Sequence, residues 1–285
     1  MTMSDDLNII AIYGFPIEHS LSPVMHNAGF NELKLNFKYI PVKVAPSDLK
    51  EAISALKALN FKGANLTVPH KEEVIDYLDE ISEDAFLIGA VNTIINSDGR
   101  LLGSNTDCKG FIAALKEAGV KDISRKKVVL LGAGGASKAA CVGLLREKVK
   151  ELVIVNRTVR KAELLQENYK KPFKKSKIRV LPLDCEALRT EFSDCDILVN
   201  TTSVGLKNDC IKLPIDSLKS DALVYDMVYN PPKTKLLKSA EKHGLKIENG
   251  LNMLLFQGVL GFEVWTNKKA PVSVMKKALF DAAYK

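Results

Sequence analysis

Two polar motifs in the first half of the chain carry residues suited to acid–base chemistry. Asn65-Leu-Thr-Val-Pro-His-Lys71 ends an apolar stretch with a lysine beside an amide and a hydroxyl, and Asn105-Thr-Asp107 supplies a carboxylate. Such an amine can stabilise negative charge on a reacting oxygen and donate a proton. Without this context, Lys71 would be read as a solvated residue at the start of a helix.

Two further motifs supply hydroxyl and amide groups. Ser20-Leu-Ser22 places two hydroxyls just before a helix predicted at residues 23–33, with Ser22 as its N-cap. Two hydroxyls and the positive end of a helix suit a carboxylate ligand. Capping alone explains Ser22 but not Ser20. Gly89-Ala-Val-Asn-Thr93 adds amides that suit a ligand with several hydroxyl groups.

A glycine-rich turn in the second half indicates a phosphate site. The apolar strand predicted at residues 127–131 leads directly into Gly132-Ala-Gly-Gly-Ala-Ser137, and a helix follows to about residue 146. Such a turn lets backbone N–H groups approach a phosphate at the helix N-terminus. Ser137 stands where the dinucleotide-binding fingerprint has its third glycine, a departure that keeps a small side chain. The β-α-β context strengthens an otherwise weak motif.

The end of the next strand favours NADP over NAD. An NAD-binding fold usually has an acidic residue about 20 residues beyond the turn, where it binds the ribose hydroxyls. Here the sequence reads Asn156-Arg157-Thr158, without a carboxylate. Arg157 offers a planar cation for a 2′-phosphate, and Arg160 and Lys161 follow. The alternative is an ordinary surface arginine at a strand end.

The pattern of apolar residues predicts two kinds of α/β organisation. In the first half we expect strands at residues 8–13, 37–44 and 63–68, helices at 23–33, 48–59 and 71–78, and a hairpin of 93–96 with 100–104. A helix at 107–118 follows. Strands at 127–131, 152–155, 178–181, 197–200 and 222–228 then alternate with helices, which predicts a doubly wound parallel sheet. Two helices, 253–265 and 272–284, end the chain.

The predicted fold class is therefore α/β, with an N-terminal mixed α/β substrate domain and a C-terminal Rossmann-like domain. We expect residues 1–106 to form the substrate-binding catalytic domain and residues 107–251 the NADP-binding domain. The C-terminal helices, about 252–285, are expected to pack back on the first domain.

Composition excludes several classes of protein. The chain has 285 residues, of which 46% are hydrophobic and 26% charged, as in ordinary globular proteins. No apolar stretch reaches the length of about 18 residues that a transmembrane helix needs, so no membrane partner is expected. Residues 1–6 lack the basic start and apolar run of a signal peptide.

The five cysteines form no Cys-x-x-Cys pair, which indicates reduced thiols and a cytoplasmic location. The four histidines form no metal motif with them, and no metal is predicted. The net charge is +7, concentrated partly in residues 169–179. We interpret that run as a solvated loop, with no nucleic-acid partner.

Eight motifs, taken together and in order, resemble the shikimate dehydrogenase (shikimate/quinate dehydrogenase) family. They are Ser20-Leu-Ser-Pro-x-x-His-Asn27, Asn65-Leu-Thr-Val-Pro-His-Lys71, Gly89-Ala-Val-Asn-Thr93, Asn105-Thr-Asp107, Gly132-Ala-Gly-Gly-Ala136, Asn156-Arg-Thr158, Tyr225-Asp-Met-Val-Tyr-Asn-Pro231 and Gly250-x-x-Met-Leu-x-x-Gln257. The sequence departs from the family at Asn252, often glycine, and at His70, frequently phenylalanine.

The resemblance implies NADP-dependent, reversible reduction of 3-dehydroshikimate to shikimate, a step of chorismate and aromatic amino-acid biosynthesis. It pairs Lys71 with Asp107 as catalytic residues, and leaves open which of them carries the transferred proton. Two alternatives remain: a dual shikimate/quinate dehydrogenase able to use NAD, and a non-catalytic NADPH-binding regulator. The regulator should lack Lys71 or Asp107, and this chain has both. The oligomeric state, monomer or homodimer, stays open.

The resemblance also assigns binding residues. For the substrate they are Ser20, Ser22, Asn65, Thr67, Asn92, Asp107, Tyr229 and Gln257. For the cofactor they are Gly132, Ala133, Gly134, Gly135, Ala136, Asn156, Arg157, Thr158, Thr201, Ser203, Met227 and Gly250.

Overall fold

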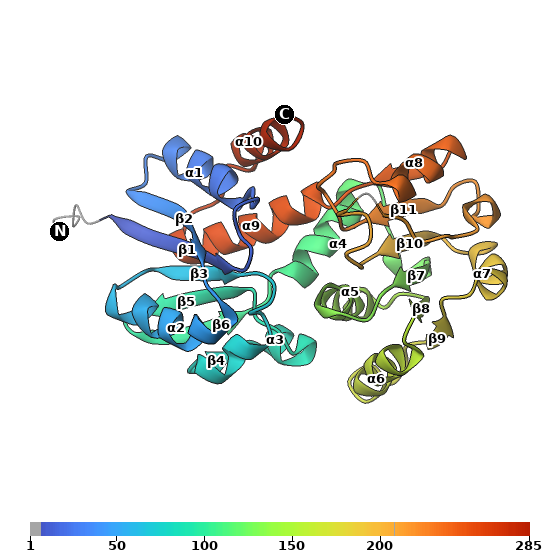
Figure 1. Cartoon of the computed structure of the whole chain (residues 1–285), viewed down its shortest axis with the longest axis horizontal. Coiled ribbons are helices and arrows are strands. Elements are labelled where there is room, and N and C mark those ends of the chain that lie inside the picture. The colour runs from blue at the N-terminus through green and yellow to red at the C-terminus, as the bar shows by residue number, and fades with distance from the viewer. Residues whose placement is uncertain (1–6, 208) are drawn as a thin grey trace. The chain divides into compact units, whose positions relative to one another are not determined.

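The structure, a computed structural model, describes residues 7–207 and 209–285 (Figure 1). The chain divides into two units, the first formed by Met1–Gly110 with Leu254–Lys285 and the second by Phe111–Met253. The sequence prediction set these boundaries at 106/107 and 251/252. Residues 1–6, on which the signal-peptide prediction rests, lie outside the described residues.

The first unit is built on a six-stranded mixed sheet in the order β2-β1-β3-β5-β6-β4. Its strands are β1 (Asn8–Gly14), β2 (Phe37–Lys43), β3 (Gly63–Leu66), β4 (Glu80–Ile81), β5 (Thr93–Ser97) and β6 (Arg100–Ser104). β1 pairs in parallel with β2 and β3, whereas β5 runs antiparallel to β3 and β6. The β5–β6 hairpin turns through Asp98 and Gly99, both at positive φ, as the Ser-Asp-Gly sequence predicted.

Helices from both ends of the chain complete this unit. They are α1 (Ser22–Glu32), α2 (Leu49–Ala58), α3 (Glu83–Ile88), the start of α4 (Asp107–Glu117), most of α9 (Leu251–Thr266) and α10 (Val272–Ala283). α10 packs against α1 (Figure 1). Trp265 of α9 donates its indole N–H to the Ile94 carbonyl at 2.9 Å. The predicted return of the C-terminal helices to the first unit is confirmed.

Two local predictions in this unit were wrong. Residues 71–78 form a turn and a 3-10 helix, Glu73–Tyr77, because so short a segment favours the tighter i→i+3 pattern. Ser22 is the first residue of α1 rather than its N-cap. The Leu21 carbonyl already accepts the first helical bond, from Met25 N at 3.3 Å, and no side chain caps the helix. The Ser22 hydroxyl therefore has no capping role.

The second unit contains a six-stranded parallel sheet in the order β12-β11-β10-β7-β8-β9. Its strands are β7 (Lys127–Leu131), β8 (Glu151–Asn156), β9 (Ile178–Pro182), β10 (Ile197–Asn200), β11 (Leu223–Asp226) and β12 (Lys246–Glu248). The helices between them are α5 (Gly135–Arg146), α6 (Val159–Lys170), α7 (Cys185–Phe192) and α8 (Lys235–Lys242). This is the predicted doubly wound topology, and the strand order reverses between β7 and β10.

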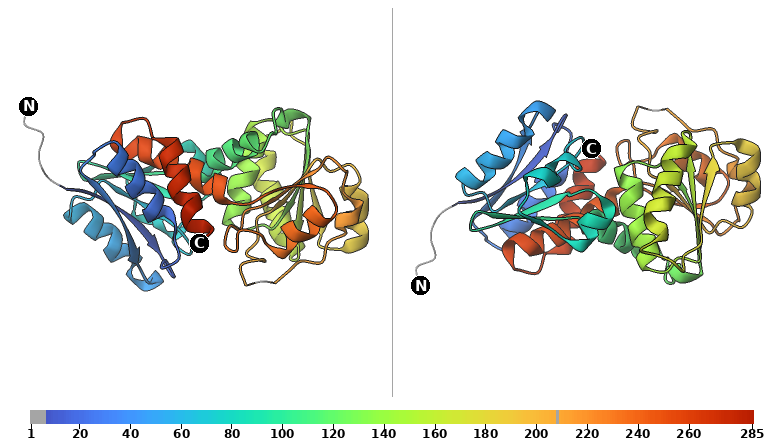
Figure 2. Two further views of the ribbon diagram at one scale, coloured as in Figure 1. Left: turned by 90° about the horizontal axis from the view of Figure 1, so that it is seen from above. Right: turned by 90° about the horizontal axis from the view of Figure 1, so that it is seen from below.

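Helices cover both faces of this parallel sheet (Figure 2). β7 is therefore buried at all five positions, and its sequence is apolar almost throughout rather than alternating. Val129 and Leu131 share one core cluster with Phe192 of α7 and Leu237 of α8. Within the described residues, no helix is long and apolar enough to cross a membrane.

Candidate active site and nucleotide site

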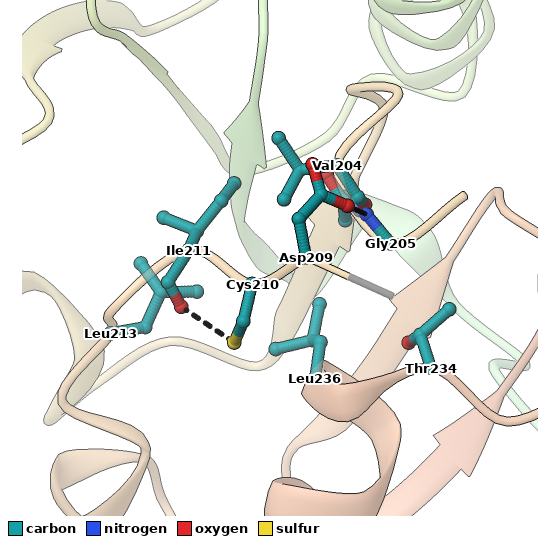
Figure 3. A pocket seen from close by; sticks show the side chains of 9 residues that line it. Val204, Gly205, Asp209, Cys210, Ile211, Leu213, Thr234 and Leu236 are labelled. Carbon is teal, nitrogen blue, oxygen red and sulfur yellow. Dashed lines mark hydrogen bonds between the residues drawn. The ribbon is translucent and has the colours of Figure 1, made fainter. Parts of the chain in front are cut away.

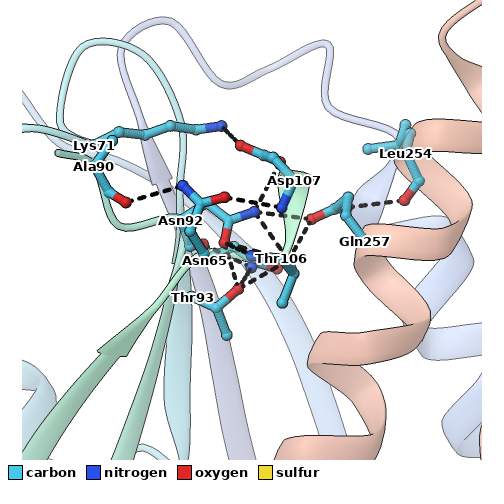
Figure 4. A network of polar contacts seen from close by, with 10 residues as sticks. Asn65, Lys71, Ala90, Asn92, Thr93, Thr106, Asp107, Leu254 and Gln257 are labelled. Carbon is cyan, nitrogen blue, oxygen red and sulfur yellow. Dashed lines mark hydrogen bonds and ion pairs between the residues drawn. The ribbon is translucent and has the colours of Figure 1, made fainter. Parts of the chain in front are cut away.

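Lys71 and Asp107 form an ion pair in the first unit, with 2.6 Å between Lys71 Nζ and Asp107 Oδ2 (Figure 4). Lys71 lies in the turn after β3, where its carbonyl accepts from Val91 N at 2.7 Å. Asp107 opens α4, a favourable position for a carboxylate. The lysine side chain is 28% exposed and that of the aspartate 13%, so the pair is largely buried yet open to a ligand. The structure thus brings the two predicted catalytic residues together.

Asn92 fixes the orientation of the Asp107 carboxylate. Asn92 Nδ2 donates to Asp107 Oδ1 at 2.8 Å, so both carboxylate oxygens accept from N–H donors. Asn92 Oδ1 accepts in turn from Thr106 N at 2.8 Å and from Thr93 Oγ1 at 2.9 Å. Asn92 is 2% exposed. Its side chain therefore supports the ion pair more than it faces solvent.

Asn65 occupies a similarly buried position at the end of β3. Its Nδ2 donates to the Asn92 carbonyl at 2.8 Å and to Thr93 Oγ1 at 3.1 Å. Its Oδ1 accepts from the Tyr39 hydroxyl at 2.6 Å. Both amide hydrogens are thus used within the protein, which leaves Asn65 only acceptor capacity for a ligand.

Gln257 reaches the same network from α9. Its Nε2 donates to the Leu254 carbonyl at 2.8 Å, and its Oε1 accepts from Asn92 Nδ2 at 3.4 Å and Thr106 Oγ1 at 3.5 Å. A Cβ on Gly110 would lie 2.7 Å from the Gln257 backbone nitrogen. Glycine at 110 therefore permits the close approach of α4 and α9 that places Gln257.

The predicted ligands that carry hydroxyl groups are buried or half-buried. Ser20 is half-buried and its Oγ accepts from Ser22 N at 3.4 Å, whereas Ser22 is 3% exposed. Thr67 is half-buried, and its methyl group would lie 2.4 Å from a Cβ on Gly14, which requires glycine there. Tyr229 belongs to the second unit, where burial raises its pKa.

His70, which departs from the family's sequence pattern, occupies a core position. Its ring is fully buried, and its Nε2 lies 2.8 Å from the Val44 carbonyl. A hydrogen bond to a backbone carbonyl explains how an imidazole fits there. His70 therefore contributes to packing rather than to the polar network of Lys71 and Asp107.

The glycine turn of the second unit has the shape that the sequence indicated. Gly132 has φ +113°, and a Cβ there would lie 2.8 Å from Thr201 Oγ1, so that glycine is required. No atom lies within 4 Å of the Cβ position at Gly134 or Gly135. The turn is thus open over the start of α5, a helix of 12 residues. Open backbone at a helix N-terminus suits a phosphate group.

Ser137 explains how the turn tolerates the loss of the third glycine. The residue is fully buried, and its Oγ accepts from Gly134 N at 3.2 Å. It also hydrogen-bonds the Thr201 hydroxyl, which donates to the Leu131 carbonyl at 2.6 Å. Ser137 therefore ties the glycine turn after β7 to the loop after β10.

Arg157 is exposed after β8 and makes no ion pair or hydrogen bond among the described residues. Arg160, by contrast, pairs with Glu163 at 3.4 Å and Glu167 at 3.0 Å on its own helix. Asn156 Nδ2 donates to the Thr158 carbonyl at 2.9 Å, which shapes the strand end. The exposed guanidinium of Arg157 is thus available for an anion, whereas that of Arg160 is engaged.

The other predicted cofactor residues follow the ends of the strands. Ser203 is exposed and Met227 is half-buried. The two loops are joined where Met227 N donates to the Asn200 carbonyl at 2.9 Å. A Cβ on Gly250 would lie 2.1 Å from the Met227 carbonyl oxygen, so only glycine fits. These residues line the carboxyl edge of the sheet, where open α/β sheets bind ligands.

Asp226 is a residue whose role the sequence did not reveal. It is fully buried at the end of β11, and burial raises its pKa. Its Oδ1 accepts from Asn200 Nδ2 at 2.9 Å and Val228 N at 3.0 Å, and its Oδ2 accepts from Thr234 Oγ1 at 2.6 Å. Asp226 thus joins the ends of β10 and β11 to the start of α8. The sequence signal that could have pointed to this role is the position of Asp226 within the Tyr225–Pro231 motif.

A small pocket is lined by residues that follow β10 and by residues at the start of α8 (Figure 3). Its lining includes Asn200, Gly205, Asp209 and Thr234, and Asp209 Oδ1 accepts from Gly205 N at 2.6 Å. None of the predicted cofactor residues lines it, so it is distinct from the glycine turn. In the described part of the chain, no group of three His, Cys, Asp or Glu residues is arranged to hold a metal ion.

Three family models match the chain. The shikimate dehydrogenase substrate binding domain matches residues 12–94, the shikimate/quinate 5-dehydrogenase family residues 114–208, and the shikimate 5′-dehydrogenase C-terminal domain residues 250–280. Together these matches extend over both units.

Relatives match along nearly the whole length of the chain. The shikimate dehydrogenase (NADP(+)) of Methanopyrus kandleri is 43% identical over 284 residues, covering 99% of this chain and 98% of that protein. A crystal structure of a shikimate dehydrogenase in complex with NADP⁺ has a TM-score of 0.90 and 40% identity, covering 98% of this chain and 96% of that one. The structure of the shikimate 5-dehydrogenase of Listeria monocytogenes, in complex with shikimate and NAD, has a TM-score of 0.90 and 39% identity. The match covers 98% of this chain and 99% of that one.

Proposed function

The chain belongs to the shikimate dehydrogenase family, and from this premise we propose that it is an oxidoreductase that reversibly reduces 3-dehydroshikimate to shikimate with NADPH. The observation that carries the proposal is the Lys71–Asp107 ion pair, held at 2.6 Å by the surrounding amides. The role that follows is a step of chorismate and aromatic amino-acid biosynthesis, with the cytoplasm as the proposed location.

The second unit fits a dinucleotide with a 2′-phosphate. The exposed backbone N–H groups of Gly135 and Ala136 would hold the pyrophosphate, and Gly134, whose N–H is bonded to Ser137, would leave space for it. Arg157, with Asn156 and Thr158, would bind the 2′-phosphate. Thr201, Ser203, Met227 and Gly250 would line the ribose and nicotinamide. When bound, NADPH supplies the hydride.

In the first unit, Lys71 would act on the carbonyl oxygen of the substrate. As negative charge builds on that oxygen during the reduction, the Lys71 ammonium would stabilise the charge and donate the proton. Asp107 would orient the ammonium and a ring hydroxyl. This assignment of the proton to Lys71 rests on the bonding of Asp107, whose two oxygens both accept hydrogen bonds.

The remaining side chains would bind the substrate's other groups. Ser20 and Ser22 would hold the carboxylate, and Thr67 and Gln257 the ring hydroxyls. Asn65 would contribute its acceptor oxygen, since its amide hydrogens are engaged. Asn92, whose oxygen already accepts two hydrogen bonds, would hold the network in place beside the ring hydroxyls. The role of Tyr229 as a further carboxylate ligand rests on the family resemblance.

The test is reduction of NADP⁺ or NAD⁺, followed at 340 nm, with shikimate or quinate in all four combinations. Of the four combinations, we expect strong reduction only in the one that contains shikimate and NADP⁺. Comparable rates with quinate or NAD⁺ would support the dual-specificity alternative. A folded protein that binds NADPH and reduces nothing would be a regulator, and the proposed function would be wrong.

A further inference from the structure

His26 and Asn27 belong to the first polar motif, yet neither is among the proposed ligands. Asn27 clamps the backbone of one residue on β2. Its Oδ1 accepts from Tyr39 N at 2.9 Å and its Nδ2 donates to the Tyr39 carbonyl at 2.9 Å. β2 is the edge strand of its sheet, so the Asn27 amide replaces a missing neighbouring strand at this residue.

His26 holds the ring of the same tyrosine. The two rings stack with centroids 4.3 Å apart and planes 5° apart, and Trp265 packs against Tyr39 at 6.1 Å. Tyr39 is 1% exposed. Neither nitrogen of the buried His26 ring has a hydrogen-bond partner, and burial lowers its pKa to about 3. His26 therefore packs as a neutral aromatic ring.

The hydroxyl that these contacts fix connects two proposed ligand groups. It donates to Asn65 Oδ1 at 2.6 Å. This direction is set by Asn65, whose Nδ2 is turned toward the Asn92 carbonyl and whose Oδ1 can only accept. A side-chain hydrogen bond also links Tyr39 to Ser22. Because the Tyr39 proton is used on Asn65, Ser22 is the donor in that bond. Under the proposed function, the Ser22 hydroxyl turns this proton to the substrate carboxylate when shikimate binds.

We propose that Tyr39 is a positioning residue for the substrate, which holds the Asn65 amide and the Ser22 hydroxyl in the geometry that binds shikimate. The inference rests on the proposed function and adds to it a residue outside the assigned ligands. Tyr39 acts through Asn65, which in turn contacts Asn92 beside the ion pair. The hydroxyl itself has both of its partners within the protein.

The test compares Tyr39→Phe with Tyr13→Phe. Tyr13 is a matched control, because it is also buried, lies on the neighbouring strand β1, and donates its hydroxyl to the Ala52 carbonyl at 3.4 Å, away from the proposed ligands. We expect Tyr39→Phe to raise the KM for shikimate about tenfold, since it leaves a buried acceptor on Asn65 unpaired. The KM for NADP⁺ should stay unchanged and kcat should change by less than about threefold. Tyr13→Phe should leave all three values unchanged.

The outcomes separate the inference from the proposed function. An inactive wild-type protein would overturn the proposed function. An active wild type in which both variants show the same KM for shikimate would overturn the role of Tyr39. If Tyr39→Phe does not fold, Asn27→Asp replaces it, because a carboxylate oxygen facing the Tyr39 carbonyl loosens the same residue while keeping its hydroxyl. That variant should also raise the KM for shikimate selectively, and an unchanged KM would contradict the inference.

Discussion

The two candidate sites are built in opposite ways. In the first unit the proposed reacting groups bond to one another, so that Lys71, Asp107 and Asn92 form one nearly closed network. In the second unit the proposed contacts are left open, with exposed backbone at Gly135 and a guanidinium on Arg157 that pairs with none of the described residues. The difference teaches that a reaction centre needs fixed geometry before the ligand arrives, whereas phosphate recognition needs groups with bonds still to make.

The largest expected effect comes from removing the amine. Lys71→Ala should lower kcat about a thousandfold, because it removes both the charge that stabilises the carbonyl oxygen and the proposed proton donor. The dissociation constant for NADP⁺ should be unchanged. Steady-state kinetics and fluorescence titration measure the two quantities. A near-normal kcat in a folded Lys71→Ala variant would show that the ion pair is not the reaction centre.

Arg157→Ala should weaken the proposed nucleotide site of the second unit. Loss of a charge-assisted, bidentate contact should raise the KM for NADP⁺ about thirtyfold and leave kcat unchanged. Arg160→Ala is the matched control, because its guanidinium already pairs with Glu163 and Glu167. If both variants bind NADP⁺ equally well, the 2′-phosphate is bound elsewhere.

Two alanine substitutions in one turn should separate folding from binding. Gly132→Ala should destabilise the protein by about 2 kcal/mol, because of the positive φ and the contact with Thr201. Gly134→Ala should leave the melting temperature unchanged, since nothing lies near the added methyl group, yet weaken NADP⁺ binding about tenfold by occupying the phosphate's space. Calorimetry and titration give both values. Equal effects of the two variants on stability would contradict the open turn.

The pH dependence of the free energy of unfolding tests the burial of His26, whose ring stacks on Tyr39 in the first unit. The pKa of His26 is lowered to about 3 by burial, against 6.5 in the unfolded chain. The unfolded state therefore binds more protons between these values, and the free energy of unfolding falls as the pH drops below about 6.5. At pH 5 this amounts to about 2 kcal/mol relative to pH 7. Denaturant unfolding of the wild type and His26→Phe at both pH values should show this loss in the wild type alone. Parallel losses would mean that another group is responsible.

The strands β7, β8, β10 and β11 of the second sheet were predictable because each is a buried, largely apolar run that ends in a polar or glycine-rich turn. Short elements held by tertiary contacts were not: β12 has three residues and α3 six. The roles of Tyr39 and Asp226 were also beyond the sequence. Each depends on a hydrogen-bond partner 26 residues away, Asn65 for Tyr39 and Asn200 for Asp226. Only the register of the folded strands reveals such pairs.

The identity of the candidate ligands was predictable from motifs, but the division of labour among them was not. Asn65 and Asn92 were predicted to bind ring hydroxyls. The structure shows that most of their hydrogen-bonding groups serve the protein itself. Residue type and spacing indicate which side chains gather at a site, whereas the hydrogen-bond directions depend on their packing.

The most direct test of the account is the turnover of Asp107→Asn at saturating shikimate and NADP⁺. The substitution keeps the shape of the side chain but replaces a carboxylate, whose two oxygens accept from Lys71 and Asn92, with a neutral amide that has one acceptor oxygen. We expect kcat at least about a hundredfold below that of the wild type, with the dissociation constant for NADP⁺ unchanged. Turnover close to that of the wild type would show that the Lys71–Asp107 pair does not carry the reaction.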